Sequence, residues 1–399
     1  MKVCFFSPTA YAYFYPTDSG WAGGAENQQV MIAKHMVNRG INVSFIVGDY
    51  GQPDAELVEG ITLIKSFEPF KGNRKLRFVS DMLKIQRAMK IADADIYNQR
   101  STSFFTGQLS YFASRLGRPF TFSIGIDYNC YPDGGGLLPL PISLLYRYGI
   151  RNSAAVIAQS HDQKRIFSKN FDKEPVVIRN GIEIVPRSEM APSENHIVPA
   201  APDADASIAR TQPKLLEFLW VGSIRRRKHP ELYLDLAQAV PEADFTLIGG
   251  EGDDEAFYRE IVARTETIEN LHYEGFIPHR NITQYYRRCF AYVNTSTIEG
   301  FPNTYLYSWM YGAPVLTIEI DPDRIIVENG IGETTGSFEG LVEAVRRLCQ
   351  NPGRRIEMSR RARDYVERHH DIAVTGDNYI ELFERLLTSS SRSRSSRSA

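Results

Sequence analysis

Short apolar runs alternate with longer segments of mixed polarity along the first half of the chain. The runs predict strands at residues 3–6, 43–47, 61–64, 120–124, 155–158 and 176–178. Between Gly24 and Gly40, Ile32 and Met36 stand four residues apart on one helix face, and Gly40 supplies a C-terminal stop. Strands separated by helices indicate a parallel sheet with crossover helices.

A second alternating series follows a break in this pattern. Residues 186–213 are rich in Pro, Ala, Ser and acidic residues without a sustained apolar period, and they predict a partly disordered interdomain linker. Further strands are predicted at residues 216–221, 245–248, 271–273, 290–294 and 314–317. We therefore expect one Rossmann-like domain at residues 1–185 and a second one at residues 214–370.

The end of the chain is expected to leave the second domain. Residues 371–387 are amphipathic and long enough to pack back on the N-terminal domain as a helix. Residues 388–399 contain Ser and Arg but no acid, which predicts a disordered tail and leaves contact with an anionic partner open. Two doubly wound domains facing across a cleft would place a ligand at the carboxyl ends of their strands.

The composition is that of an average folded protein. The 399 residues exceed what one hydrophobic core usually serves. An apolar fraction of 43% and a net charge of −2 give no overall attraction to nucleic acid, so no nucleic-acid partner is expected. The four cysteines are far apart and form no CxxC pair, which predicts buried thiols in a reducing compartment.

The sequence contains no signal for insertion into a membrane. It enters a strand at once, without an apolar leader, and no run of about 18 apolar residues occurs. We therefore expect a cytoplasmic protein. Peripheral attachment to the inner membrane face stays open, because it needs only an exposed basic or apolar patch.

The most informative segment is residues 295–315, which runs from a predicted strand through a glycine-containing loop into a helix. The N–H groups and dipole of a helix N-terminus favour phosphate, and Gly300 lets a ligand approach the backbone. Glu299 would repel phosphate, so its natural partners are sugar hydroxyls or a developing positive charge. An ordinary strand-to-helix loop is the competing interpretation.

A second candidate segment is residues 218–230, a strand and a glycine loop with four consecutive cations at Arg225–Lys228. These cations would repel one another unless they are solvated or face an anion, and a diphosphate is such an anion. Lys228 and one arginine are candidates for charge-assisted hydrogen bonds to it. A solvated basic turn competes with this interpretation, whereas RNA binding lacks the aromatic residues that stack on bases.

The first loop of the chain is a third, weaker candidate. It ends in Gly23-Gly24-Ala25-Glu26 at the start of a helix, where paired glycines allow close backbone approach to a phosphate or a sugar ring. The aromatic residues of this loop suit stacking on sugar faces or packing of the loop itself; they are Tyr11, Tyr13, Phe14, Tyr15 and Trp21.

Six segments, taken together and in order, resemble the retaining glycosyltransferases of family 4, which have the two-domain GT-B fold. They are GGAE at 23–26, NGI at 180–182, VGSIRRRK at 221–228, LIGGEG at 247–252, YEGFIPHRNITQYYRRC at 273–289 and EGFPN at 299–303. The resemblance implies transfer of a sugar from a nucleotide diphosphate sugar to a glycan, lipid-linked or small-molecule acceptor. It also implies retention of anomeric configuration without a metal or other cofactor.

The resemblance further implies roles for individual residues. Glu299 is expected near the donor sugar, Lys228 and Arg225 are expected to neutralise the diphosphate, and Asp127 lies where the family often has a histidine facing the sugar or acceptor. The expected donor-binding positions are Gly23, Gly24, Gly222, Ser223, Gly249, Gly250, Gly300, Phe301, Pro302, Asn303, Thr304 and Tyr307. The sugar, the base, the acceptor and the oligomeric state stay open.

Two positions depart from the family's pattern. Ser223 stands where the family has an arginine, so Arg225 is expected to replace it. Tyr307 stands where the second glutamate of a Glu-x7-Glu pattern holds the ribose hydroxyls, and a phenol carries no charge at neutral pH. A homologue that binds nucleotide or glycan without turnover is therefore the alternative hypothesis, followed by another GT-B enzyme such as an epimerase or phosphorylase.

Overall fold

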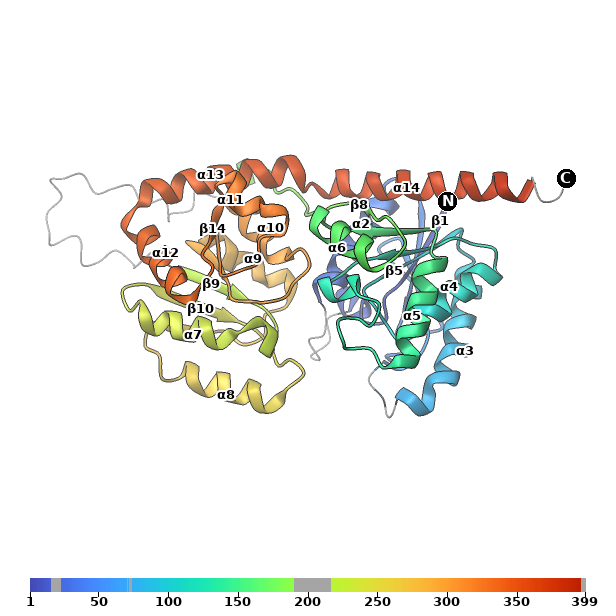
Figure 1. The fold of residues 1–399 in the computed structure, drawn as a ribbon, viewed down its shortest axis with the longest axis horizontal. Coiled ribbons are helices and arrows are strands. Elements are labelled where there is room, and N and C mark those ends of the chain that lie inside the picture. The colour runs from blue at the N-terminus through green and yellow to red at the C-terminus, as the bar shows by residue number, and fades with distance from the viewer. Residues whose placement is uncertain (16–22, 70, 72–73, 190–216, 396–399) are drawn as a thin grey trace, which may run out of the picture. The chain divides into compact units, whose positions relative to one another are not determined.

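The computed structural model describes residues 1–15, 23–69, 71, 74–189 and 217–395. The chain divides into two units, one of Met1–Glu183 with His370–Ala399 and the other of Ile184–His369. Each unit contains one sheet of its own with helices around it (Figure 1). The predicted α/β class with two Rossmann-like domains is confirmed. Most of the predicted linker, residues 190–213, lies outside the described residues.

The sheet of the first unit has the strand order β3-β4-β2-β1-β5-β6-β7-β8. Its strands are β1 (Lys2–Phe6), β2 (Asn42–Val47), β3 (Ala55–Val58), β4 (Ile61–Lys65), β5 (Ile96–Arg100), β6 (Phe120–Ser123), β7 (Ala155–Ala158) and β8 (Val176–Val177). All pairs are parallel except β3 with β4. The strand order reverses between β1 and β5, which makes their carboxyl ends the switch point of this sheet.

Helices cover both faces of this sheet. They are α1 (Tyr11–Phe14), α2 (Gly24–Asn38), α3 (Arg74–Ala92), α4 (Thr106–Arg115), α5 (Leu140–Asn152), α6 (His161–Asn170) and α14 (Ile372–Ser395), with a 3₁₀ turn at Asp127–Cys130. Along β1, Val3 and Phe5 join one apolar cluster with α2 and α14, while Cys4 and Phe6 join another with α3, α4 and α5. Successive side chains of a strand point to opposite faces, so each face has a separate helical layer.

Helix α14 returns the end of the chain to the first unit, where it packs on α2. The Asp377 carboxylate accepts hydrogen bonds from His35, at 2.8 Å, and from Nε of Arg39, at 3.0 Å. The expected disordered tail is wrong for residues 388–395, because the same helix continues to Ser395. Extending an existing helix by a residue costs far less than starting one, so a polar Ser/Arg segment can follow an anchored helix.

The sheet of the second unit is entirely parallel, in the order β11-β10-β9-β12-β13-β14. Its strands are β9 (Glu217–Val221), β10 (Asp244–Ile248), β11 (Leu271–Tyr273), β12 (Ala291–Asn294), β13 (Val315–Thr317) and β14 (Gly332–Thr334). Its helices are α7 (Pro230–Ala239), α8 (Glu255–Thr265), α9 (His279–Arg288), α10 (Asn303–Met310), α11 (Ile325–Asn329), α12 (Phe338–Gln350) and α13 (Pro352–His369). The strand order reverses between β9 and β12, so a ligand is expected at their carboxyl ends.

Candidate functional site

Two loops meet at the switch point of the second unit. The loop after β9 contains Gly222 and a 3₁₀ turn at Arg226–Lys228 before α7 begins, and the loop after β12 spans residues 295–302 before α10 begins. Parallel pairing of β9 with β12 brings both loops to the same edge of the sheet. The two most informative segments of the sequence therefore form one site.

An ion pair joins the two loops. The Lys228 Nζ atom lies 2.6 Å from Oε1 of Glu299, with the two side chains 18% and 13% exposed. Ser296 Oγ donates to the same carboxylate oxygen at 2.9 Å. Burial raises the pKa of Glu299, but the charge and hydrogen bond of Lys228, the charge of Arg227 and the Ser296 hydroxyl outweigh it and hold the pKa below its ordinary value. Glu299 is therefore an ionised carboxylate at neutral pH.

Hydroxyl and backbone hydrogen bonds hold this pair in place. Thr295 Oγ1 donates to the carbonyl of Lys228 at 2.7 Å and accepts from Trp220 Nε1 at 3.0 Å. The Thr297 N–H donates to the carbonyl of Arg227 at 3.1 Å. The sequence analysis included Thr295 and Ser296 in its most informative segment but gave neither residue a role. Their signal is a small polar run that directly follows an apolar strand.

The glycines of these loops permit close packing of backbone on backbone. A Cβ on Gly249 would lie 2.2 Å from the carbonyl oxygen of Gly222, and one on Gly222 would lie 3.0 Å from Cδ of Lys228. The Ile224 N–H donates to the carbonyl of Gly250 at 3.0 Å. The loops after β9 and β10 thus support each other, and the half-buried Ser223 lies between Gly222 and Ile224.

The three arginines of the basic run point to different neighbours. Arg225 Nε is 3.9 Å from the Asp253 carboxylate. Arg226 Nε donates to Asp254 at 2.9 Å. Arg227 Nη1 donates to the carbonyl of Ile298 at 3.5 Å, and the charge of Arg227 contributes to lowering the pKa of Glu299. Arg227 therefore joins Arg225 as a candidate for the second cation of the site.

The N-terminus of α10 follows Glu299 of the ion pair closely in the sequence. Helix α10 begins at Asn303, after Gly300 and Pro302, and no side chain caps it. Phe301 is buried against Trp309, with ring centroids 6.4 Å apart, which anchors the loop. An uncapped N-terminus, formed here with Thr304 in its first turn, presents N–H groups and a positive dipole end that suit an anion.

Tyr307 belongs to an aromatic cluster one turn into α10. Its ring centroid is 5.6 Å from that of Tyr286 of α9, and Tyr286 lies 6.2 Å from Tyr292 of β12. Tyr307 is half-buried. This position therefore packs α10 against α9, a role that a glutamate would not fill.

The predicted residues of the first unit lie at the ends of β1 and β6. Gly23 precedes α2 without a side-chain cap, and its carbonyl accepts from the Tyr13 hydroxyl at 2.9 Å; Gly24 is the first residue of the helix. Residues 16–22, Trp21 among them, lie outside the described residues. Asp127 accepts from Gln163 Nε2 at 3.0 Å.

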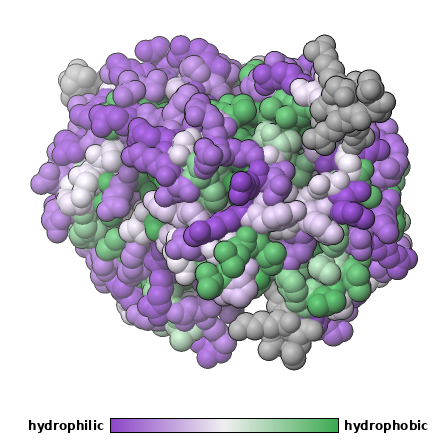
Figure 2. Space-filling model, turned by 45° about the vertical axis from the view of Figure 1, so that its right-hand side comes forward, coloured by the Kyte–Doolittle hydropathy of each residue, from purple (hydrophilic) through white to green (hydrophobic). Residues whose placement is uncertain are grey.

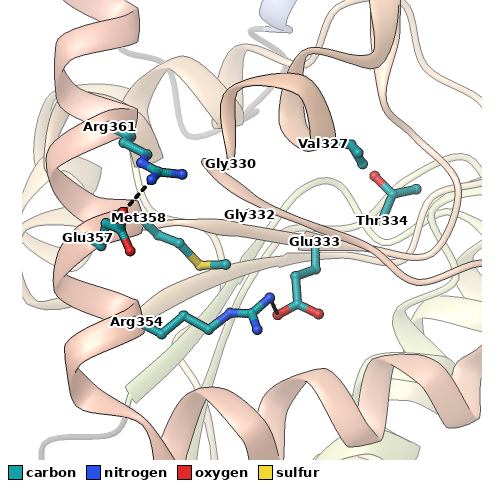
Figure 3. Close-up of a pocket in the computed structure, with 9 residues that line it drawn as sticks. All are labelled: Val327, Gly330, Gly332, Glu333, Thr334, Arg354, Glu357, Met358 and Arg361. Carbon is teal, nitrogen blue, oxygen red and sulfur yellow. Dashed lines mark hydrogen bonds and ion pairs between the residues drawn. The ribbon is translucent and has the colours of Figure 1, made fainter.

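A pocket of about 510 Å³ lies elsewhere in the second unit (Figure 3). Its lining comes from α11, β14 and α13, and the ion pairs Arg354–Glu333 and Arg361–Glu357 lie along it. None of the sequence-predicted site residues lines it. Among the described residues no group of three or more His, Cys, Asp or Glu side chains is arranged to hold a metal ion.

Comparison with known families matches both units. Residues 22–185 match the model of "Glycosyltransferase Family 4", and residues 204–365 match that of "Glycosyl transferases group 1". The second match begins inside the predicted linker and contains both loops of the ion pair. A protein of Xenopus tropicalis named glycosyltransferase 1 domain-containing protein 1 is 25% identical over 190 residues, which are 46% of this chain and 54% of that protein.

Solved structures resemble the chain over nearly its whole length. Sucrose-phosphate synthase from Thermosynechococcus elongatus superposes with a TM-score of 0.77 at 15% identity, covering 98% of this chain and 100% of that one. HepE of Anabaena, in a complex with UDP-glucose, gives 0.70 at 17% identity, covering 96% and 100%. At these identities the likeness establishes a shared fold.

Proposed function

We propose that this chain, a glycosyltransferase of the GT-B fold, moves a sugar from a nucleotide diphosphate sugar to an acceptor with retention of configuration. The acceptor is a glycan, a lipid-linked molecule or a small molecule. The observation that carries the proposal is the Lys228–Glu299 pair, 2.6 Å apart at the switch point between β9 and β12. A cation, a carboxylate and an uncapped helix N-terminus converge where a ligand of such a sheet binds.

In this proposal the diphosphate meets the positive groups of the site. Lys228 donates to a phosphate oxygen, Arg227 or Arg225 adds a second charge, and the first N–H groups of α10 receive the remaining oxygens. When the donor binds, the Lys228 ammonium group leaves the Glu299 carboxylate and pairs with a phosphate oxygen. This exchange is favourable because the phosphate carries more charge. These groups take the neutralising role of a metal, and we propose that no metal takes part.

Glu299 is proposed to bind hydroxyls of the donor sugar. An ionised carboxylate accepts hydrogen bonds only, and Ser296 already donates to one of its oxygens at 2.9 Å. Its charge also favours a sugar ring that becomes positive as the anomeric bond breaks. The solved complex of a similarly folded protein with UDP-glucose supports a hexose donor of this type.

The reaction balances without a protein nucleophile. The anomeric C–O bond of the donor breaks and its electron pair leaves with the diphosphate, whose negative charge Lys228 and the helix N–H groups stabilise. The acceptor hydroxyl gives its proton to the leaving phosphate oxygen and forms the new C–O bond on the same face of the ring. Asp127 of the first unit remains a candidate for contact with the sugar or the acceptor.

The alternative is a protein that binds nucleotide or glycan without turnover. Ser223 and Tyr307 favour it, since both differ from the pattern of the family that the sequence resembles. The half-buried Tyr307 can still exchange hydrogen bonds with a ribose hydroxyl. Turnover separates the two functions, because the alternative predicts nucleotide binding with no product.

Thermal shift with UDP, GDP, ADP and CMP tests the donor site. A ligand present at about 100 times its dissociation constant adds roughly 2.7 kcal/mol of stability, so one diphosphate should raise the melting temperature clearly. Lys228→Ala should lose most of that shift. The control is Lys34→Ala, because Lys34 also pairs with a carboxylate at 2.6 Å but lies on α2. No shift with any nucleotide, or equal shifts in wild type and Lys228→Ala, would refute the proposed site.

A further inference from the structure

The outer surface of the α3, α4 and α5 layer exposes large apolar side chains. We name it the α3–α5 face and define it by Val79, Leu83, Ile91, Tyr111, Leu116, Leu137, Leu140, Leu144 and Tyr148, all classed as exposed. Figure 2 brings forward the side of Figure 1 on which α3 and α5 are drawn, and green apolar patches lie there among purple polar ones. Clustered exposed apolar residues mark an interaction surface.

Helix α5 has two apolar stripes, and only one of them serves the core. Tyr146 and Ile150 point inward and are buried. Leu140, Leu144 and Tyr148 follow one another at intervals of four residues on the other side, where Leu140 is 73% exposed and Leu144 56%. A helix of a soluble domain normally carries polar residues on its outer side. The exposed apolar stripe of α5 therefore indicates a surface that binds a partner.

The face is a rigid platform because α4 and α5 touch through their backbones. A Cβ on Gly107 of α4 would lie 2.4 Å from the Leu145 carbonyl oxygen, and one on Gly149 of α5 would lie 2.8 Å from the Thr106 carbonyl oxygen. Two glycines that face each other's helix fix the spacing of the pair. The exposed residues of α4 and α5 are thus held in a fixed arrangement relative to one another.

The charges interspersed with these apolar residues are positive. Lys84, Lys90, Arg115, Arg147 and Arg151 are exposed, and no described residue forms an ion pair with any of them. Of the acidic residues on the same segments, Asp81 is buried and pairs with Arg77 at 3.1 Å, whereas Asp133 is exposed, accepts from the Gly135 N–H and keeps its charge. The exposed cations outnumber it. The face is basic although the whole chain has a net charge of −2.

We propose that the α3–α5 face docks on a lipid bilayer that carries anionic headgroups. A stable peripheral attachment needs both apolar insertion and electrostatic attraction, and this face offers both. At a bilayer, lysine and arginine side chains reach the headgroups while the leucines enter the acyl boundary. No helix of the described part of the chain is long and apolar enough to cross a membrane, so the contact lies on the surface.

Vesicle co-sedimentation of the full chain tests the proposal. The protein should pellet with vesicles of equal parts phosphatidylcholine and phosphatidylglycerol but stay in solution with phosphatidylcholine alone. Raising the ionic strength from about 0.1 M to 1 M shortens the Debye length from about 10 Å to 3 Å and should release much of the bound protein. Failure to pellet with the anionic vesicles would overturn the proposal.

Two double variants address the two components of binding. Leu140→Ser/Leu144→Ser removes apolar insertion, and Arg147→Gln/Arg151→Gln removes two charges; each should weaken binding roughly tenfold or more. The matched control is Leu57→Ser/Val374→Ser, because these residues are 72% and 56% exposed and lie on β3 and α14 of the same unit. The control should bind as wild type.

Other outcomes are decisive as well. Equal binding by wild type and both face variants, or equal loss in the control, would overturn the assignment of this face. Self-association without lipid that Leu140→Ser/Leu144→Ser abolishes, measured by sedimentation velocity, would make it an interface between protein copies instead. Melting temperatures check folding, and if the leucine variant unfolds, the arginine variant carries the test. Nucleotide binding in the second unit does not enter this readout, so the proposed function can stand or fall separately.

Discussion

The two sheets have the same kind of switch point but use it differently. In the second unit, Lys228 and Glu299 meet at the carboxyl ends of β9 and β12 while both remain partly exposed. In the first unit, Arg100 at the end of β5 is buried and donates to Asn180 at 2.7 Å, which in turn donates to Gln159 at 2.8 Å. Charges that solvent can reach are available to a ligand, whereas a buried hydrogen-bonded network holds structure together.

The network of the first unit gives the NGI segment a structural role. Gly181 exchanges two hydrogen bonds with Gln28 of α2, at 2.8 and 3.0 Å. The Asn180 carbonyl contacts His370 Nδ1 at 2.7 Å, where the chain re-enters the first unit. Burial lowers the pKa of Arg100 below its ordinary value. The segment joins β5, α2 and the start of the last helix.

The largest expected effect is on turnover, in Lys228→Ala. Removing one preorganised donor that stabilises negative charge costs about 10²–10³ in rate. Initial rates with a nucleotide sugar, compared with Lys34→Ala as control, measure the effect. Turnover of Lys228→Ala within a factor of a few of wild type would mean that the charged pair serves structure, as the first unit's network does.

The second largest effect is on stability, in Arg100→Ala. The substitution leaves Asn180 Oδ1 buried without its donor, so the free energy of unfolding should fall by about 1–3 kcal/mol. Urea denaturation measures it, with Arg151→Ala as an exposed control that should stay within about 0.5 kcal/mol of wild type. Nucleotide shifts should persist in both variants. A stable Arg100→Ala protein without turnover would instead make the first unit's switch point a ligand site.

The sequence predicted the two sheets and both loops of the second unit, but it did not predict that Lys228 and Glu299 pair. Apolar alternation predicts two parallel sheets, and both loops of the second unit were assigned to a ligand. Lys228 and Glu299 are 71 residues apart, and only the strand order brings them together. Knowing that β9 and β12 are neighbours requires the three-dimensional structure.

Three strands escaped prediction, namely β3, β5 and β14, and the last two show why. Strand β5 reads IYNQR, yet all five residues are buried, because Asn98 donates to Thr121 and Ser123 and Arg100 donates to Asn180. Its polarity is satisfied inside the sheet, so an apolar period does not mark it. Strand β14 reads GET and contains no large apolar residue, so no apolar run marks it. Contacts between distant segments, rather than local pattern, determine such elements.

A smaller effect concerns acid stability. The lowered pKa of Glu299 means that its ionised form is favoured in the folded state, so this stabilisation is complete above the ordinary value of 4.5 and is lost as pH falls through the folded value. Glu299→Gln lacks this dependence. Unfolding free energies between about pH 3 and 7 should therefore fall more steeply on acidification in wild type than in the variant. Parallel curves would show that the pair contributes nothing to folding.

Lys228→Ala should reverse that dependence. Burial is already the largest single influence on the Glu299 pKa, and without the lysine only the weaker effects of Arg227 and Ser296 oppose it, so the pKa should rise. The charged carboxylate then disfavours folding, and the variant should gain stability relative to wild type as the pH falls. The same denaturation series measures this, and a steeper acid loss in Lys228→Ala than in wild type would contradict the assigned pairing.

The smallest effect is expected at Tyr307, which combines a packing role with a place on a ligand-binding helix. Its ring packs against Tyr286, 5.6 Å away between centroids, while its half-buried side chain lies on the helix that we propose receives the diphosphate. Tyr307→Phe keeps the packing and removes only the hydroxyl, so nucleotide affinity should fall by roughly tenfold at most, the value of one neutral hydrogen bond. Calorimetric titration of the diphosphate that shifts the wild type measures it. Unchanged affinity would assign Tyr307 to packing alone, and the ribose would then need another partner in the second unit.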